Sequence, residues 1–154
     1  MSPIAKRSAK QIPAVKSHAI AEKGVLDAIV GKLTELQLTE MVERGLPISS
    51  VDVLRREGLT FSEVHGLVLP ARTLKHRKEK KQALSIEEAD RTLRIARVMA
   101  QANRVFGNHE KALRWLRRPN DRLDGRAPLE MLRSEVGGDL VRQMLYQIDE
   151  GIYV

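Results

Sequence analysis

The segment TFSEVHGLVLPARTLKHRKEKK, residues 60–81, decides how the front half of the chain is interpreted. Thr60 and Glu63 have the spacing of a capping box, which predicts a short helix ending at residues 68–69. Pro70 fits the start of a second helix, because an amide hydrogen there would have no helical partner. Two short helices joined by a tight turn, the second one basic, are typical of a helix-turn-helix.

The second of these helices carries six Lys and Arg in the ten residues 72–81. The beginning of such a helix faces the major groove of DNA, and we expect Leu74 to anchor it to the core. Arginine and threonine suit base edges and lysine suits phosphates, although most charge runs are simply solvated surfaces. The predicted DNA-binding residues are Arg72, Thr73, Lys75, His76, Arg77, Lys78, Lys80 and Lys81.

The charge of the chain is unevenly distributed. Residues 1–81 hold 15 Lys and Arg against 9 Asp and Glu, whereas residues 82–154 hold 12 against 11. We therefore expect a polyanionic partner for the front half only. The chain has no cysteine, which fits a reducing compartment. No apolar run approaches the roughly 20 residues of a membrane span, so we predict a cytoplasmic protein without membrane contact.

The front half divides into an arm and a domain. Residues 1–19 are basic, contain Ser and Pro and show no helical or strand period, which predicts a disordered arm; contact with phosphates is the alternative. The helix-turn-helix domain is expected over residues 20–83. Thr34 and Gln37 resemble a capping box in its first part, and an apolar helix is expected over residues 48–58.

The longest predicted helix opens the back half and spans residues 86–106. Ser85 and Glu88 form its capping box. Its apolar residues cover far more than one stripe, so two sides of this helix must be buried. One side is expected to pack under the C-terminal block. The other side belongs either to the same core or to a homodimer interface.

Shorter helices are expected after Gly107. One spans residues 109–118, another begins at Pro128, and the pair Gly137-Gly138 is expected to separate it from the last helix. Gly151 is placed to end that last helix. The apolar positions of the last helix recur at helical spacing, at Leu140, Val141, Met144, Leu145 and Ile148.

Several short motifs in the back half follow one another in a specific order. They are LSIEEADR at 84–91, ARV at 96–98, VFG at 105–107, ALRWL at 112–116, PN at 119–120, Gly125, PLEML at 128–132 and GIY at 151–153. This series resembles the Xre/MbcA/ParS antitoxins, the partners of RES-domain toxins in bacterial type II toxin–antitoxin operons. The segment VLPARTL at 68–74 resembles the opening of that family's recognition helix, so the resemblance covers roughly residues 20–154.

The resemblance implies an all-α protein with an Xre-like helix-turn-helix domain and, over residues 84–154, a small helical toxin-binding domain. The first domain would bind and repress its own operator, and the second would inhibit a RES toxin, which depletes NAD. The antitoxin would be no enzyme and would hold no cofactor or metal, in keeping with its scattered histidines. The alternative is a free-standing regulator whose C-terminal domain dimerises or senses a ligand.

The end of the chain is the segment predicted to block the toxin's active site. A cleft for NAD needs cationic donors for the pyrophosphate, so the carboxylates near the C-terminus and the ring of Tyr153 would suit it. The simpler interpretation is a frayed terminus. The predicted toxin-binding residues are Arg142, Tyr146, Asp149, Glu150, Gly151, Ile152, Tyr153 and Val154.

Overall fold

The computed structural model describes Ile29 and residues 33–152 of the chain. These residues form helices and turns and contain no strand, in agreement with the predicted all-α fold. The elements are α2 (Glu35–Arg44), α3 (Ser49–Arg56), α4 (Phe61–Leu67), α5 (Ala71–Glu79), α6 (Ile86–Phe106), α7 (His109–Arg117), the 3-10 helix η1 (Asp121–Leu123), α8 (Pro128–Met131) and α9 (Glu135–Asp149). The predicted arm over residues 1–19 lies outside the described residues.

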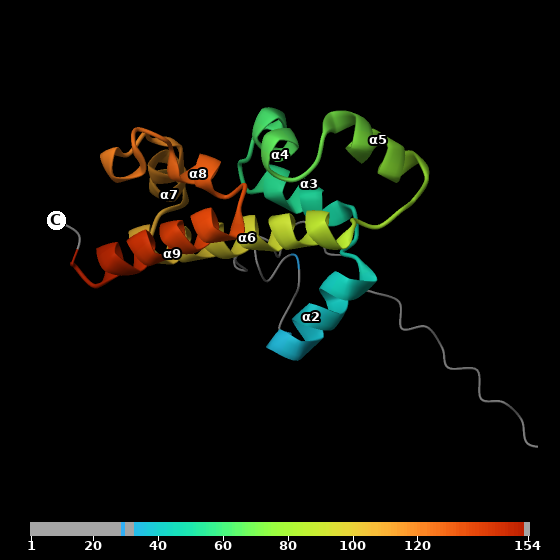
Figure 1. Ribbon diagram of the computed structural model, residues 1–154, viewed down its shortest axis with the longest axis horizontal. Coiled ribbons are helices and arrows are strands. Elements are labelled where there is room, and N and C mark those ends of the chain that lie inside the picture. The colour runs from blue at the N-terminus through green and yellow to red at the C-terminus, as the bar shows by residue number, and fades with distance from the viewer. Residues whose placement is uncertain (1–28, 30–32, 153–154) are drawn as a thin grey trace, which may run out of the picture.

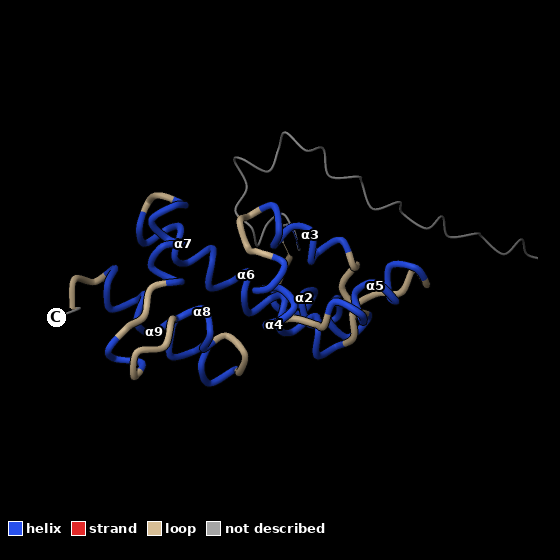
Figure 2. The backbone as a smooth tube through the Cα atoms, turned by 90° about the horizontal axis from the view of Figure 1, so that it is seen from above, coloured by secondary structure: helices blue, strands red, loops and turns tan. Residues whose placement is uncertain are grey.

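The long helix α6 is the element around which the others are arranged (Figure 1). Helices α2 and α3 pack against it from the front half of the chain, and α7 and α9 pack against it from the back half. Seen from above, α3 and α5 lie toward one end of α6, whereas α7, α8 and α9 lie toward the other (Figure 2). The helix therefore belongs to both halves of the fold.

One apolar core runs through both halves. Its side chains include Leu54 and Val64 from the front half and Leu116, Val141 and Leu145 from the back half. The apolar residues of α6 that are fully buried in it are Ala89, Ile95, Ala96, Val98, Met99 and Ala102. The predicted breadth of the apolar surface on α6 is thus explained by helices of the same chain. Burying α6 requires no second subunit, and the homodimer stays a prediction.

The helix beginnings are defined by local hydrogen bonds. At the start of α6, the Glu88 amide donates to Ser85 Oγ at 3.2 Å, and the Ser85 amide donates to Glu88 Oε2 at 2.8 Å. Such reciprocal bonds satisfy amides that have no partner within the helix. All three predicted capping boxes are present, at Thr34–Gln37, Thr60–Glu63 and Ser85–Glu88.

The predicted role of Gly137 and Gly138 as a separator is wrong. Both glycines lie in the first turn of α9, which begins at Glu135 and is capped by Ser134 Oγ, 3.0 Å from the Gly137 amide. A Cβ atom on Gly137 would collide with the carbonyl oxygen of Met131, and one on Gly138 would lie 2.9 Å from Arg94 Cδ. The glycines therefore serve close packing against α8 and α6.

Two smaller boundaries also differ from the prediction. Helix α7 ends at Arg117 rather than at residue 118. Helix α5 begins at Ala71, as predicted, with Pro70 at the N-cap position, but it ends at Glu79 rather than at Lys81. The proline still suits its place, because its ring fixes φ at −60° and the preceding Leu69 is buried in the turn.

Candidate functional site

The helix-turn-helix outline is formed by α4, the turn at residues 68–70 and α5. Val68 and Leu69 in the turn are buried, and Leu74 is the buried residue of α5, as predicted for its anchor. Arg91 of α6 donates from Nη1 to the carbonyl oxygen of Val68 at 3.1 Å. The turn is therefore held both by the burial of its side chains and by the hydrogen bond from Arg91. Together these fix the orientation of α5 relative to α4.

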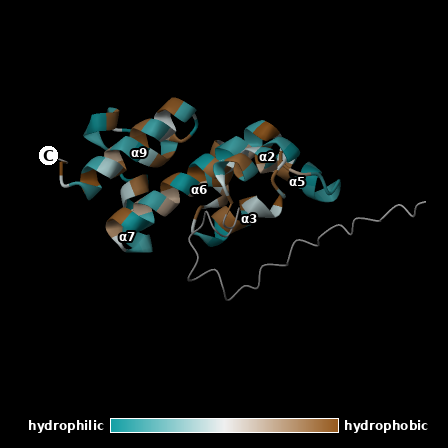
Figure 3. Ribbon diagram, turned by 90° about the horizontal axis from the view of Figure 1, so that it is seen from below, coloured by the Kyte–Doolittle hydropathy of each residue, from teal (hydrophilic) through white to brown (hydrophobic). Residues whose placement is uncertain are grey.

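The exposed surface of α5 is almost entirely hydrophilic (Figure 3). Arg72, Lys75 and His76 are exposed along the helix, and Thr73 is half-buried. Lys80 and Lys81, just past its end, are exposed as well. These predicted DNA-binding residues form a cationic surface that could reach phosphates and base edges.

Two other predicted DNA-binding residues are engaged within the protein. Arg77 Nε lies 2.8 Å from Glu88 Oε2 and Arg77 Nη2 donates to Glu88 Oε1 at 3.1 Å, with the glutamate side chain only 9% exposed. Lys78 Nζ contacts Asp52 Oδ1 at 3.0 Å. These ion pairs tie α5 to α6 and to α3. The structure thus gives both side chains a part in holding α5 in place.

Helix α9 has one apolar face in the core and another in solvent. Val141, Met144 and Leu145 are buried. On the opposite side, Val136 is 80% exposed and Tyr146 is 56% exposed. These exposed apolar side chains make this side of α9 a candidate surface for binding another molecule. Of the predicted toxin-binding residues, Tyr146, Arg142, Asp149, Glu150, Gly151 and Ile152 are exposed here, whereas Tyr153 and Val154 lie outside the described residues.

The end of α9 is a Schellman motif. The Gly151 amide donates to the carbonyl oxygen of Ile148 at 3.1 Å, and the Ile152 amide donates to that of Gln147 at 2.9 Å. Gly151 has φ +67°, a left-handed conformation that glycine adopts without strain. Gly151 therefore ends the helix, as predicted, and holds Ile152 in a defined position with its side chain 62% exposed.

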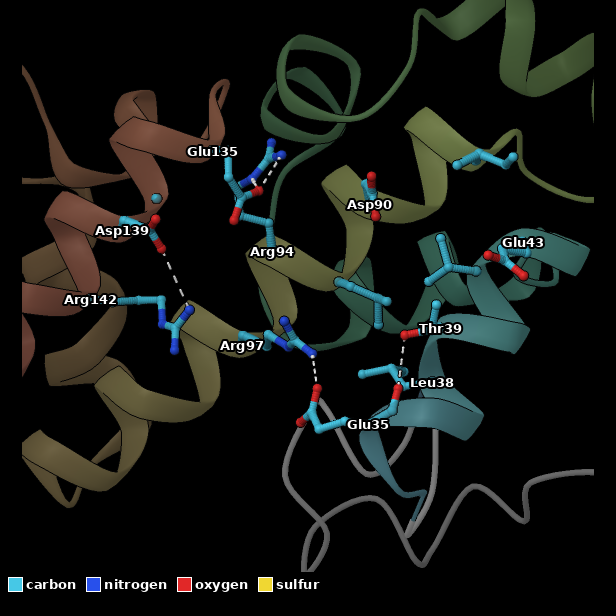
Figure 4. A pocket seen from close by; sticks show the side chains of 14 residues that line it. Glu35, Leu38, Thr39, Glu43, Asp90, Arg94, Arg97, Glu135, Asp139 and Arg142 are labelled. Carbon is cyan, nitrogen blue, oxygen red and sulfur yellow. Dashed lines mark hydrogen bonds and ion pairs between the residues drawn. The ribbon is translucent and has the colours of Figure 1, made fainter.

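An open hollow of about 660 Å³ lies between α2, α6 and α9 (Figure 4). Its sides carry mixed charges, and three ion pairs cross or border it. Arg94 Nη2 lies 2.8 Å from Glu135 Oε2, which fastens α9 to α6. The other two pairs are longer, with Arg97 Nη2 3.3 Å from Glu35 Oε2 and Arg142 Nη1 3.6 Å from Asp139 Oδ1.

A further ion pair joins the two halves of the chain on α4 and α7. Arg117 Nε donates to Glu63 Oε1 at 2.7 Å, and Arg117 Nη2 donates to Glu63 Oε2 at 2.9 Å and to the carbonyl oxygen of Gly58 at 2.7 Å. The hydrogen bonds from Arg117 lower the pKa of Glu63, although burial opposes this shift. The carboxylate that caps α4 is therefore also the attachment point of α7.

The sequence did not indicate that the two capping glutamates, Glu63 and Glu88, also form ion pairs with arginines. A capping-box carboxylate uses one oxygen for the backbone amide, and the lone pairs that remain can accept from an arginine. Glu63 and Glu88 do this with Arg117 and Arg77, which lie 54 and 11 residues away. The capping box was visible in the sequence, but nothing local indicated which arginine would complete it.

Comparison with known proteins assigns both halves. Residues 37–97 match the model of the antitoxin Xre-like helix-turn-helix domain, and residues 101–151 match that of the antitoxin Xre/MbcA/ParS C-terminal toxin-binding domain. An antitoxin Xre of Pseudomonas putida is 45% identical over 118 residues, which is 77% of this chain and 74% of the relative. The chain belongs to the Xre/MbcA/ParS antitoxin family.

Two further relatives agree with this assignment. An antitoxin Xre of Photorhabdus laumondii is 30% identical over 75% of this chain and 80% of its own length. An antitoxin Xre of Yersinia enterocolitica is 26% identical over 92% of this chain and 95% of its own length. The family confirms the predicted resemblance and the prediction that the chain is not an enzyme. The match to a toxin-binding domain favours the antitoxin over the alternative of a toxin-free regulator.

The described residues add two negative findings. They contain no group of three His, Asp or Glu residues placed to hold a metal ion. None of the helices in that part of the chain is both long and apolar enough to cross a membrane.

Proposed function

We propose that this antitoxin inhibits a RES-domain toxin encoded in the same operon, blocking the toxin's active site with the C-terminal segment that follows α9. The observation that carries this proposal is the Schellman motif at Gly151. Because the motif holds Ile152 in one position before the toxin binds, less conformational entropy has to be lost when the complex forms. The exposed Tyr146 and Val136 extend the same surface along α9.

We further propose that the antitoxin represses its own operon through α5. Its exposed side chains, among them Arg72, Lys75 and His76, supply phosphate contacts and at least one group able to read a guanine edge. Repressors of this class bind two half-sites about one helical turn of DNA apart, which requires a dimer. We therefore include a homodimer in the proposal, and light scattering with and without operator DNA tests it.

Truncation separates the two activities. Deleting residues 151–154 should abolish protection of cells that express the toxin, because the blocking segment is gone, while operator affinity stays as in the full chain. Growth after toxin induction and a gel-shift titration measure the two. Full protection by the truncated protein would exclude the tail as the blocking segment.

The reciprocal variant is Arg72→Ala. It should weaken operator binding by about 1–3 kcal/mol if the side chain reads a base, and should leave protection from the toxin intact. An unchanged operator affinity would show that α5 is oriented differently on the DNA. Together the two variants distinguish a loss of one surface from a loss of the fold.

A further inference from the structure

A second hollow, which is mainly cationic, adjoins the mixed hollow of Figure 4 and shares Glu35, Arg97 and Arg142 with it. It measures about 540 Å³ and opens between α2, α6 and α9. Three arginines line it, Arg97 and Arg104 from α6 and Arg142 from α9, together with Ala100, Gln101 and a single carboxylate, that of Glu35. We call these six residues the arginine hollow.

The arginines of the hollow are held loosely compared with others in the protein. Arg94, which lies on the same helix, is 12% exposed and bonds both to Glu135 and to the carbonyl oxygen of Leu132. Arg97, by contrast, pairs at 3.3 Å with Glu35, whose side chain is 92% exposed. A pair so exposed is screened by water and contributes little.

The other two arginines are similarly available. Arg142 is 3.6 Å from Asp139, which is itself mostly exposed and lies only one turn away on α9. Arg104 is exposed, and no ion pair to it is found within residues 33–152. Their guanidinium groups can therefore exchange present contacts for a better partner at little cost.

The backbone keeps these arginines together. Positions 97, 101 and 104 fall on one face of α6, with the Cα atoms of Arg97 and Arg104 roughly 10 Å apart along the helix. Gln101 Nε2 donates to the carbonyl oxygen of Arg142 at 2.9 Å, which holds α9 beside that face. Like charges gathered in this way repel one another, so an anionic partner would be bound favourably.

We propose that the arginine hollow binds an acidic segment of the toxin, a second contact besides the C-terminal tail. This inference rests on the proposed toxin binding. Guanidinium groups hold carboxylates through two parallel hydrogen bonds, and arginine is the usual choice for such pairs at interfaces. Gln101, Arg104 and Arg142 lie within the toxin-binding domain, at residues 101–151.

The position of the hollow favours the toxin over DNA. Helix α5 contributes no residue to it and lies toward the other end of α6 (Figure 1). Helix α9, which contributes Arg142, also carries the exposed Tyr146 one turn further on. The hollow therefore lies next to an exposed aromatic side chain of the toxin-binding domain.

Charge reversal tests the proposal on the full-length chain. The double variant Arg104→Glu, Arg142→Glu should bind the RES-domain protein encoded beside this chain's gene at least about tenfold more weakly, and its affinity should depend less steeply on salt. Calorimetry at low and high salt measures both. The matched control is Arg114→Glu, Arg118→Glu, which makes the same charge change at exposed positions of the same domain outside the hollow.

Each outcome decides between interpretations. A loss confined to the first variant, with thermal unfolding and operator affinity unchanged, supports the proposal; the pair Arg104→Lys, Arg142→Lys should then retain part of the affinity. Equal losses in both charge-reversed variants, or no loss, would overturn it. A loss of operator affinity instead would make the hollow a DNA contact. If the unmodified chain itself fails to bind the toxin, the proposed function falls, and with it this inference.

Discussion

Helices α5 and α9 carry the two outward-facing surfaces of the antitoxin, and they are attached to the fold by different forces. Helix α5 buries one side chain, Leu74, and is otherwise held by the ion pairs of Arg77 and Lys78. Helix α9 buries two glycines and the side chains of Val141, Met144 and Leu145. Helix α5 is therefore held mainly by ion pairs, whereas α9 is held mainly by apolar packing, with the Arg94–Glu135 ion pair in addition.

This difference has a physical origin. A recognition helix must expose most of its circumference to a polyanion, so it has little apolar surface left for the core and relies on polar attachments. The last helix exposes only one side, and its other side is free to pack. The two helices should therefore respond differently to truncation of the core, to the loss of a charge and to pH.

The largest effect is expected from the core side of α9. Leu145→Ala should lower the free energy of unfolding by about 2–5 kcal/mol, because the side chain is fully buried and leaves a cavity. Leu74→Ala is the comparison on α5 and should fall at the low end of that range, since Leu74 is at the edge of the core. Urea unfolding measures both. If Leu145→Ala lowered the free energy of unfolding less than Leu74→Ala, apolar packing would matter more for α5 than for α9, contrary to this prediction.

A moderate effect is expected from the charged attachment of α5. Glu88→Gln keeps a side chain able to cap α6 but removes the charge opposite Arg77, and should cost about 1–3 kcal/mol. Added salt should narrow the difference between this variant and the unmodified chain. Operator affinity should fall while toxin affinity stays, as measured by gel shift and calorimetry. A change in toxin affinity of similar size would show that α5 and α9 are not independent.

The smallest effect concerns pH and the Arg117–Glu63 pair that joins the halves. The pKa of Glu63 is lowered in the folded protein. Its carboxylate therefore contributes fully to stability above the pKa of an unfolded glutamate, and this contribution is lost as pH falls through the pKa of Glu63 in the folded protein. Between about pH 5 and pH 3 the unmodified chain should therefore lose more stability than Glu63→Gln. Acid titrations of the two proteins, followed by circular dichroism, measure this difference. Identical unfolding curves would contradict the prediction.

The parts of the fold that could be predicted are those fixed by neighbours in sequence. Ser85 and Glu88 predicted the start of α6, and Gly151 predicted the end of α9. Both could be predicted because the hydrogen bonds that begin or end a helix join residues only three to five positions apart. Gly137 and Gly138 were misjudged because the close approach that requires them is set by Met131 and Arg94, which belong to other elements.

The candidate binding surfaces also contain features that could be predicted from the sequence and features that could not. The exposure of Arg72 and the burial of Leu74 follow from helical period and could be predicted. The engagement of Arg77 could not, because its partner Glu88 is brought near only when α5 folds back against α6. The arginine hollow was likewise invisible, since Arg97, Arg104 and Arg142 are spread over 46 residues of sequence and meet only after α9 packs.

The 21 residues of α6 pass from the helix-turn-helix domain into the toxin-binding domain without a linker. At 1.5 Å per residue the helix is a rod of roughly 31 Å, so the offset between the two surfaces is set by geometry rather than by the statistics of a flexible tether. A toxin carried on α9 would occupy a fixed position above the DNA under α5. If α5 binds operator DNA as proposed, the spacing of operator sites would decide whether neighbouring antitoxins can both carry their toxins.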